Sequence, residues 1–269
     1  MDHLGLFLEE DIGRGDITTD LLVPDKDGKA DIVCESDAIA AGIEEAVTIF
    51  GRYGIKCELY AADGDRVRKG CAVMSISGPL KSIITAERTV LNIMMRMSGI
   101  ATAANDVLLK CKQVNKHIRI SGTRKTTPGF RMFEKKAIAL GGGDPHRYGL
   151  DDMILVKDNH IKAAGGMKNV IELLKKAPFT KKAEIEVENT DDAVTAARGG
   201  ADIILIDNAD PVKAKEIADA VRKVNDIQIE VSGNITIDNA AEYAEFADII
   251  SMGSLTHSVR SVHFSLNVR

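Results

Sequence analysis

The residues from Glu184 to Asp207 read E-I-E-V-E-N-T-D-D-A-V-T-A-A-R-G-G-A-D-I-I-L-I-D. A strand-like run, Glu184–Glu188, is followed by a helix-like run, Asp191–Arg198, and then by an apolar strand-like run, Ile203–Asp207. A strand, a helix and a strand over this distance predict two parallel strands joined by a crossover helix. This β-α-β unit is the pattern on which the fold prediction rests.

The same alternation extends over the chain from residue 117 onward. The further strand-like runs are Ile118–Ser121, Met153–Lys157, Ile227–Ser232 and Asp248–Met252. The further helix-like runs are Arg131–Leu140, Met167–Ala177, Pro211–Val224 and Ile237–Phe246. The number of units and the nearly continuous apolar strands favour a (β/α) barrel over an open doubly wound sheet. No G-x-G-x-x-G motif follows the first strand, so a dinucleotide-binding fold gains no support.

The N-terminal part of the chain has a different pattern. We expect a loop-rich segment over residues 1–30 and a small sheet over 30–84, built from A-D-I-V-C, K-C-E-L-Y, A-V-M-S-I and K-S-I-I. A helix is expected near Ile43–Tyr53. From Thr85 to about Lys116 the apolar spacing is helical, and Ser98-Gly99 predicts a break into two helices. Arg88 falls in the first turn of this region, and the residues alone favour a structural role for it.

The segment A-D-G-D-R-V-R-K-G predicts a tight β turn between two of these strands. A similar turn occurs in biotinyl and lipoyl carrier modules, which need a modifiable lysine at a hairpin tip. Lys81 is the nearest candidate, and its context, G-P-L-K-S-I, matches poorly. A non-enzymatic carrier role is therefore disfavoured.

Composition excludes several classes of protein. The 269 residues carry a formal net charge of -5, whereas a nucleic-acid binder normally has a basic balance or face. The four cysteines, at positions 34, 57, 71 and 111, form no C-x-x-C pair, which argues against a zinc or redox motif and indicates free thiols in a reducing compartment. The N-terminus lacks a basic signal-peptide region, and no run approaches the ~18 apolar residues of a membrane span. We therefore expect a cytoplasmic protein without a membrane or nucleic-acid partner.

Cations gather between Ser121 and His160. This stretch contains S-G-T-R-K-T-T-P-G-F-R, G-G-G-D-P-H-R and M-I-L-V-K-D-N-H. Glycines and prolines beside most of the cations place them on loops, where a scaffold usually carries its chemistry. A solvated basic surface is the alternative, but it would not concentrate charge at turns and strand ends. The cations are Arg124, Lys125, Arg131, His146, Arg147, Lys157 and His160.

Polar groups follow each of the expected barrel strands at its C-terminal end. In a barrel these ends share one face, and that face holds the active site. Arginines and lysines there can bind carboxylates or phosphates, and Glu186 with Asp207 can hold Mg²⁺ together with a phosphate ester. Backbone N–H groups at Ser232-Gly233-Asn234 and Gly253-Ser254 can bind a terminal phosphate. The pattern predicts an enzyme that handles a sugar phosphate with a diphosphate–metal group and a carboxylate-rich second substrate.

A series of motifs resembles the quinolinate phosphoribosyltransferase family over nearly the whole chain. The motifs are E-R-T-V-L-N, S-G-I-A-T, T-R-K-T-T-P-G-F-R, G-G-G-D-P-H-R, K-D-N-H, E-I-E-V-E-N, L-I-D-N, S-G-N-I-T and I-S-M-G-S-L-T-H-S. The resemblance implies the type II phosphoribosyltransferase fold: an N-terminal α/β sandwich over 1–112, completed by a C-terminal strand within 258–269, and an open, irregular α/β barrel over 113–257. It also implies a homodimer, or a dimer-based hexamer, in which the N-terminal domain of one subunit covers the barrel mouth of the other.

The resemblance assigns roles to individual residues. It implies that Lys125, Lys157, Glu186 and Asp207 are catalytic, and that Glu186 and Asp207 also hold the ribose hydroxyls and Mg²⁺, directly or through water. It implies that Arg88 reaches the substrate across the subunit interface, which replaces the structural role favoured above. The other implied substrate-binding residues are Thr123, Arg124, Lys125, His146, Arg147 and Lys157. The implied phosphoribosyl- and phosphate-binding residues are Glu186, Asp207, Ser232, Gly233, Asn234, Gly253 and Ser254.

Asn234 departs from the pattern, because many relatives have glycine there. An asparagine allows close backbone approach to a phosphate less freely than glycine does.

The implied reaction transfers a phosphoribosyl group from phosphoribosyl pyrophosphate to quinolinate, in NAD biosynthesis. The products are nicotinate mononucleotide, pyrophosphate and CO₂. One alternative is a molybdenum-uptake paralogue of the same fold, in which the K-D-N-H motif is altered, and a second is nicotinate phosphoribosyltransferase. A third, from another reaction class, is a Schiff-base aldolase that uses Lys157.

Overall fold

The structure, a computed structural model, describes residues 2–269, which form two compact units. Unit 1 takes in the chain up to Asn105, together with Thr127–Gly142 and Ser258–Arg269, and unit 2 comprises Asp106–Thr126 and Gly143–His257. The domain boundaries expected from the sequence, 1–112 with 258–269 and 113–257, remain a prediction. The compact units differ from them mainly in placing residues 127–142 with unit 1.

Unit 1 is built on an antiparallel sheet in the order β12-β1-β5-β3. The strands are β1 (Asp27–Cys34), β3 (Lys56–Leu59), β5 (Ala72–Pro79) and β12 (Phe264–Val268). Phe264 pairs with Cys34 and Val268 with Ala30, so the C-terminal residues add a strand to this sheet, as the resemblance implied. Alternate residues of β1 are buried, which is the pattern of a strand with one face on a core.

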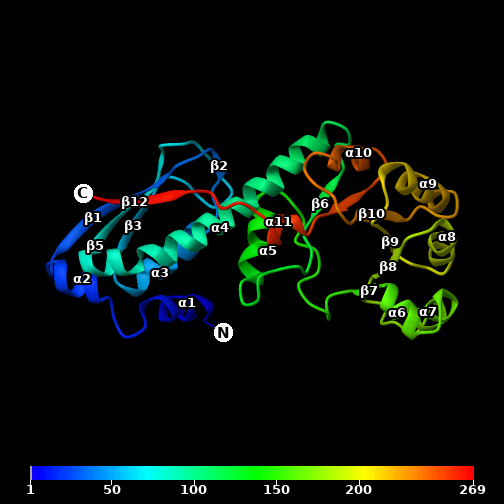
Figure 1. The fold of residues 1–269 in the computed structure, drawn as a ribbon, viewed down its shortest axis with the longest axis horizontal. Helices are drawn as coiled ribbons and strands as arrows, with labels where there is room; N and C mark the ends of the chain where they lie inside the picture. The colour runs from blue at the N-terminus through cyan, green and yellow to red at the C-terminus, as the bar shows by residue number, and fades with distance from the viewer. Residues whose placement is uncertain (1) are drawn as a thin grey trace. The chain divides into compact units, whose positions relative to one another are not determined.

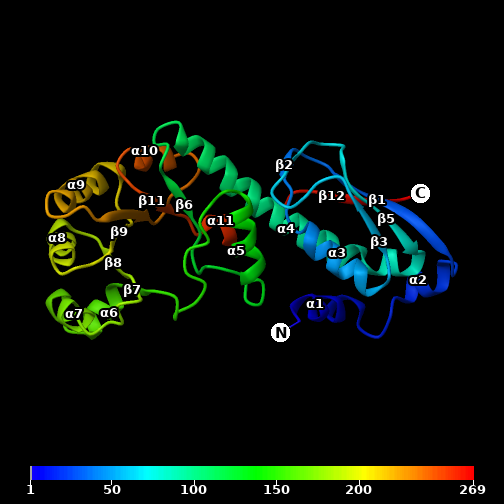
Figure 2. The same ribbon diagram turned by 180° about the vertical axis from the view of Figure 1, so that it is seen from behind.

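Helices α3 (Ile43–Arg52) and α4 (Leu80–Lys112) lie along one face of this sheet (Figures 1 and 2). Their buried residues, such as Phe50 and Met94, share one hydrophobic core with Ile32 and Met74 of the sheet. Two short strands, β2 (Ala38–Ile39) and β4 (Arg66–Val67), pair beside the main sheet. The segment expected to be a single tight β turn therefore contains a strand between two turns.

The loop-rich N-terminal segment expected from the sequence is partly wrong. Residues 2–22 form two helices, α1 (His3–Ile12) and α2 (Ile17–Leu22). Each begins after an aspartate whose side chain accepts a hydrogen bond from the first turn, from Gly5 N–H to Asp2 and from Thr19 N–H to Asp16. Side-chain caps at Asp2 and Asp16 thus start helices in a segment that was expected to consist mostly of loops.

Two expectations for the region after β5 are also wrong. K-S-I-I is not a strand, because α4 begins at Leu80, and the helix continues without a break through Ser98-Gly99. The Ser98 hydroxyl bonds to the backbone of Ala41, and a Cβ at Gly99 would lie 2.3 Å from the carbonyl oxygen of Arg260. The glycine therefore permits a close backbone approach inside a continuous helix. Arg88 lies in the body of α4 and not in its first turn.

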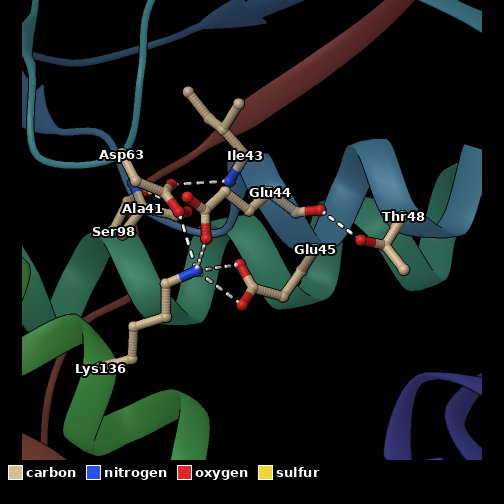
Figure 3. Close-up of polar contacts among 8 residues, drawn as sticks. All are labelled: Ala41, Ile43, Glu44, Glu45, Thr48, Asp63, Ser98 and Lys136. Atoms are coloured by element: carbon tan, nitrogen blue, oxygen red, sulfur yellow. Dashed lines mark hydrogen bonds and ion pairs between the residues drawn. The ribbon is translucent and has the colours of Figure 1, made fainter.

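Helix α5 (Arg131–Leu140) belongs to unit 1 through a polar cluster centred on Lys136 (Figure 3). The ammonium lies 2.7 Å from Glu44 and 2.8 Å from Glu45, both in α3, and 3.0 Å from Asp63. Asp63 in turn accepts a hydrogen bond from the first N–H of α3, at Ile43. One lysine thus ties α5 to α3 and to the loop before β4. Burial lowers the pKa of Lys136, but the carboxylates raise it by more, so that it lies well above its usual value.

Unit 2 contains a six-stranded parallel sheet in the order β6-β11-β10-β9-β8-β7. From β7 to β11, each strand pairs with the next strand along the chain, and β11 also pairs with β6. Over the described residues, the consecutive strands β6 and β7 alone do not pair, so the sheet has the strand order of an open barrel. The fold class expected from the sequence is therefore confirmed. The strands are β6 (Arg119–Ser121), β7 (Ile154–Val156), β8 (Ala183–Val187), β9 (Ile203–Asp207), β10 (Gln228–Ser232) and β11 (Ile249–Ser251).

The helices of unit 2 follow its strands along the chain, and most of them, α6 to α10, lie outside the sheet (Figures 1 and 2). They are α6 (Asp158–Ala163), α7 (Met167–Leu174), α8 (Thr190–Arg198), α9 (Pro211–Arg222), α10 (Ala240–Ala244) and α11 (Ser254–His257). Over residues 2–269, no helix combines the length and the apolar character that a membrane crossing requires.

Candidate active site

A cavity of about 310 Å³ lies in unit 2, and five of the six strands of the parallel sheet contribute to its lining, while Gly122 directly follows the sixth, β6. The lining residues come mostly from the C-terminal strand ends, as the barrel prediction required. They are Gly122, Thr123, Arg124, Lys125, His146, Arg147, Leu155, Lys157, Glu186, Leu205, Asp207, Glu230, Ser232 and Ser251.

Five of the sequence-predicted site residues lie outside this lining. Arg88 is an exposed residue of α4 in unit 1. Gly233 and Asn234 follow β10 directly, and Gly253 and Ser254 follow β11, so both pairs lie next to residues that line the cavity.

Two guanidinium groups form the cationic part of the cavity. The Nε of Arg124 is buried and has no hydrogen-bond partner among the described residues. Burial and the neighbouring Arg124 charge both lower the pKa of Arg147. The two positive charges repel each other, and the buried Arg124 Nε–H donates to no acceptor in the described part of the chain. A bound anion would stabilise both arginines.

Lys157 and Glu186 form an ion pair across neighbouring strands. Lys157 follows β7 and its ammonium donates to Glu186 of β8 over 2.6 Å. The lysine side chain is 48% exposed and that of the glutamate 11%, so the ammonium faces the open part of the cavity. The backbone N–H of Lys157 donates to the ring Nδ1 of His160, which caps the start of α6. His160 therefore holds the K-D-N-H turn and does not line the cavity.

Asp207 lies at the end of β9, beside Glu186 at the end of β8. Burial, and then the charge of Glu186, raise the pKa of the Asp207 carboxyl above its usual range. The negative charges of the two carboxylates repel each other, and a divalent cation between them would relieve this repulsion. Carboxylate oxygens are also the ligands that Mg²⁺ prefers. The residues present therefore fit Mg²⁺.

A chain of side-chain amides holds Asp207 in place. Asn208 donates to the Asp207 carboxylate over 2.6 Å, and Asn234 donates to the Asn208 amide oxygen over 3.2 Å. Both asparagines have a left-handed backbone, with φ of 54° and 51°. The departure from glycine at Asn234 is thus compatible with the turn, since asparagine tolerates this conformation. Between them Gly233 is required, because a Cβ there would lie 2.3 Å from Asn208 Oδ1.

Lys125 packs against the loop after β11. Thr256 donates to its carbonyl oxygen over 2.8 Å, and a Cβ at Gly253 would lie 2.9 Å from the Lys125 side chain. This contact places the Gly253 loop beside the T-R-K-T-T loop. Arg131, another cation of the predicted cluster, begins α5 in unit 1 and is not among the residues that line the cavity.

His146 and two buried glutamates form a group that the sequence prediction missed. The His146 Nε2 lies 3.5 Å from Glu184 Oε2 and 3.4 Å from Glu230 Oε2. Glu184 is fully buried and Glu230 is 1% exposed. The signal was present in the alternation of the strands: Glu184 shares a face with Glu186, and Glu230 with Ser232.

The protonation of the His146 ring is set by opposing effects. Burial lowers its pKa, but the contacts with Glu184 and Glu230 raise it by more, to about 10. The backbone N–H of Arg147 donates a hydrogen bond to Nδ1 of His146 over 2.8 Å. A proton on Nδ1 would clash with this N–H. A pKa of about 10 on its own would put a proton on both ring nitrogens, but Nδ1 faces the Arg147 amide, which cannot give up its hydrogen, so the geometry assigns a single proton, on Nε2.

Comparison with known proteins places these features in a family context. Residues 16–98 match the family model described as Quinolinate phosphoribosyl transferase, N-terminal domain, and residues 100–267 match the corresponding C-terminal domain model. The chain is 40% identical to the probable carboxylating nicotinate-nucleotide pyrophosphorylase of Methanothermobacter thermautotrophicus, over 100% of this chain and 99% of that protein. It is 42% identical to the protein of the same description from Archaeoglobus fulgidus, over 94% and 98% of the two chains.

The fold agrees with a solved structure of the same kind. The crystal structure of nicotinate-nucleotide pyrophosphorylase from Ehrlichia chaffeensis matches with a TM-score of 0.94 and 30% sequence identity. The match covers 99% of this chain and 97% of that one.

Proposed function

The chain belongs to the quinolinate phosphoribosyl transferase family, and from this membership we propose that the unit 2 cavity joins quinolinate to the ribose of phosphoribosyl pyrophosphate, with loss of CO₂. The chain is thus a pentosyltransferase of NAD biosynthesis. Its products are nicotinate mononucleotide, pyrophosphate and CO₂.

The unpartnered, buried Nε of Arg124 beside Arg147 is the observation that supports this substrate most strongly. Quinolinate is a dicarboxylate, and a second carboxylate needs a second cationic partner. Guanidinium groups bind carboxylates through two parallel hydrogen bonds, which also fixes the plane of the ring. A monocarboxylate such as nicotinate would leave part of this cationic surface without a partner.

Positioning and charge stabilisation would account for most of the rate. The arginines hold the pyridine ring so that its nitrogen attacks C1 of the ribose, while the bond from C1 to pyrophosphate breaks and the ribose passes through an oxocarbenium-like state. Lys157 and Lys125 lie at the cavity, where they can stabilise the negative charge that develops on the leaving oxygen. Quaternisation of the nitrogen makes the ring an electron sink, so the electrons of the C2–carboxylate bond pass into the ring as CO₂ leaves, and a proton then replaces the carboxylate at C2.

Glu186 and Asp207 would hold Mg²⁺ with the ribose hydroxyls of the donor, directly or through water. The cation, when bound, would neutralise charge on the pyrophosphate. The raised pKa of Asp207 supports this role, because burial and the charge of Glu186 disfavour its ionised form, and a bound cation would offset both effects. The turns at Ser232, Gly233 and Asn234, and at Gly253 and Ser254, would bind the 5-phosphate through backbone N–H groups.

Arg88 lies in unit 1, and we propose that it acts in the site of a second subunit. The assembly would then be a homodimer, or a hexamer built from dimers, with shared active sites. We place the reaction in the cytoplasm, which the four free thiols support.

Parallel incubations with quinolinate and with nicotinate, each with phosphoribosyl pyrophosphate and Mg²⁺, test the proposal. We expect nicotinate mononucleotide and CO₂ from quinolinate only. Turnover of nicotinate without CO₂ would favour nicotinate phosphoribosyltransferase, and no turnover of either would favour the molybdenum-uptake paralogue. Borohydride trapping of a carbonyl substrate on Lys157 would instead indicate an aldolase.

A further inference from the structure

Glu184 and Glu230 are the most deeply buried acidic side chains at the cavity. They come from β8 and β10, which are separated in the sheet by β9. Both oxygens of Glu184 and one of Glu230 have no hydrogen-bond partner among the described residues. Two buried carboxylates in this state are costly unless a nearby group compensates them. The His146 ring is the group that lies within 3.5 Å of both.

Both nitrogens of the His146 ring are turned toward protein groups. Nε2 faces the two carboxylates, and Nδ1 accepts the backbone N–H of Arg147. The ring therefore has no free donor for a substrate carboxylate. It links the barrel interior to the main chain of a residue that binds the anion.

The backbone at His146 is strained, and this supports a positioning role. Its φ is 57°, in the left-handed region that residues other than glycine adopt uncommonly. The turn is held at its other end by Asp144, whose carboxylate accepts the His146 N–H over 2.7 Å. The Asp144 carbonyl oxygen in turn accepts the N–H of Gly122, at the end of β6. The carboxylate cluster supplies the attraction that keeps the ring, and hence the Arg147 backbone, in this conformation.

We propose that Glu184 and Glu230 are positioning residues that act through His146 to fix Arg147 for binding of the acceptor's carboxylates. The inference rests on the proposed function only for the identity of that acceptor, quinolinate. It assigns His146 an indirect role, in place of the direct contact with substrate that the family resemblance implied.

A divalent cation on the same three side chains is the competing interpretation, since their ligand atoms lie within 4.8 Å of one another. The acceptor role of Nδ1 puts the ring proton on Nε2, where a metal ion would have to bind. The geometry therefore favours a proton between the carboxylates.

Steady-state kinetics of paired variants test the proposal. Glu230→Ala and Glu184→Ala should each raise the KM for quinolinate by about tenfold or more, with kcat and the KM for phosphoribosyl pyrophosphate changed less than about threefold. Glu230→Gln and Glu184→Gln should recover most of the loss, because the amide oxygen still presents a partial negative charge to the Nε2 proton. Equal loss in the Ala and Gln variants, or an effect confined to the phosphoribosyl pyrophosphate KM, would overturn the proposal.

Nitrogen-15 spectroscopy of the unmodified protein keeps the test valid if a variant does not fold. The His146 ring should show the neutral tautomer with hydrogen on Nε2, and Zn²⁺ added alone to metal-free protein should leave these signals unchanged. A metal-bound Nε2, or a proton on Nδ1, would contradict the arrangement. A wild-type protein with this tautomer but without activity on quinolinate would instead refute the proposed function alone.

Discussion

The ammonium of Lys157 lies 2.6 Å from the carboxylate of Glu186, and the two residues come from the ends of adjacent strands. Both residues line the cavity together with Arg124, Arg147 and Asp207. Burial and the charge of Glu186 raise the pKa of Asp207, and the charge of Lys157 lowers it. Substrate charge and metal charge would thus meet at this ion pair, which makes it the most informative place to perturb the site.

Lys157→Ala should abolish most of the turnover and leave the fold intact. Removal of one preorganised donor from a developing negative charge typically costs about 100-fold in kcat or more. Release of labelled CO₂ from quinolinate measures the effect, and thermal unfolding checks the fold. Lys162→Ala is a matched control, because Lys162 forms an exposed ion pair with Asp158 nearby. Full activity of Lys157→Ala would remove this residue from the mechanism.

Gly233→Ala should impair binding of phosphoribosyl pyrophosphate. The new Cβ would lie 2.3 Å from Asn208 Oδ1 and 2.6 Å from Asn208 N, so the asparagine that holds Asp207 must move. Gly200→Ala is the control, since Gly200 has almost the same φ, 90° against 88°, with no atom within 4 Å of its Cβ. Both variants should lose about 1–2 kcal/mol of stability from backbone strain, but only Gly233→Ala should raise the KM for the donor. A similar KM in the two variants would show that the Asn208 contact is unimportant.

Magnesium affinity should fall as pH falls, beginning above the range of an ordinary aspartate. Burial and Glu186 raise the pKa of Asp207, so this carboxylate is a ligand above that pKa and becomes protonated as pH falls through it. Affinity should then drop by roughly tenfold for each pH unit below the pKa. Titration of Mg²⁺ in the presence of phosphoribosyl pyrophosphate measures this, and Asp207→Asn should bind weakly with a flatter pH dependence. A Mg²⁺ affinity that stays unchanged as the pH falls to about 4 would contradict the assignment of Asp207.

Lys136→Met should destabilise unit 1 without a direct effect on the cavity chemistry. The substitution leaves Glu45 and Asp63, whose side chains are 10% and 5% exposed, without their cation. We expect a loss of about 1–3 kcal/mol in the free energy of unfolding, measured with denaturant. Lys175→Met, which removes an exposed pair with Glu172, should cost less than about 1 kcal/mol. Equal losses would mean that the cluster in Figure 3 contributes no more than a surface pair.

Mixed assemblies test the proposed role of Arg88. Arg88→Ala and Lys157→Ala should each be nearly inactive alone, but a mixture of the two should recover part of the activity. Recovery is expected because one kind of shared site would contain both an intact Arg88 and an intact Lys157. The two variants should be unfolded together and refolded before the assay, with each variant refolded alone as the control. A mixture no more active than its parts would place Arg88 outside a shared site.

The sequence predicted the barrel because its strands and helices alternate over a long stretch, and polar residues lie at or just after the C-terminal end of each strand. It failed where local signals had a tertiary cause. Gly99 resembled a helix break, but it permits contact with the Arg260 backbone. Residues 1–30 were expected to be rich in loops, but Asp2 and Asp16 cap helices there. Contacts made by residues far apart in the sequence decide such cases.

The candidate site shows the same limit. Arg124, Arg147, Lys157, Glu186 and Asp207 could be predicted because they lie at strand ends and in recognisable motifs. Glu184 and Glu230 could not be assigned in the same way, because their importance depends on the position of His146. That position depends on the left-handed backbone conformation of His146, which no local sequence pattern predicts.

The release of CO₂ from quinolinate labelled in its 2-carboxylate, measured together with nicotinate mononucleotide, tests the central claim most directly. With phosphoribosyl pyrophosphate and Mg²⁺ present, we expect one CO₂ for each nicotinate mononucleotide, and neither product when the donor is omitted. Formation of the mononucleotide from nicotinate, or the absence of labelled CO₂ in the complete mixture, would contradict the account.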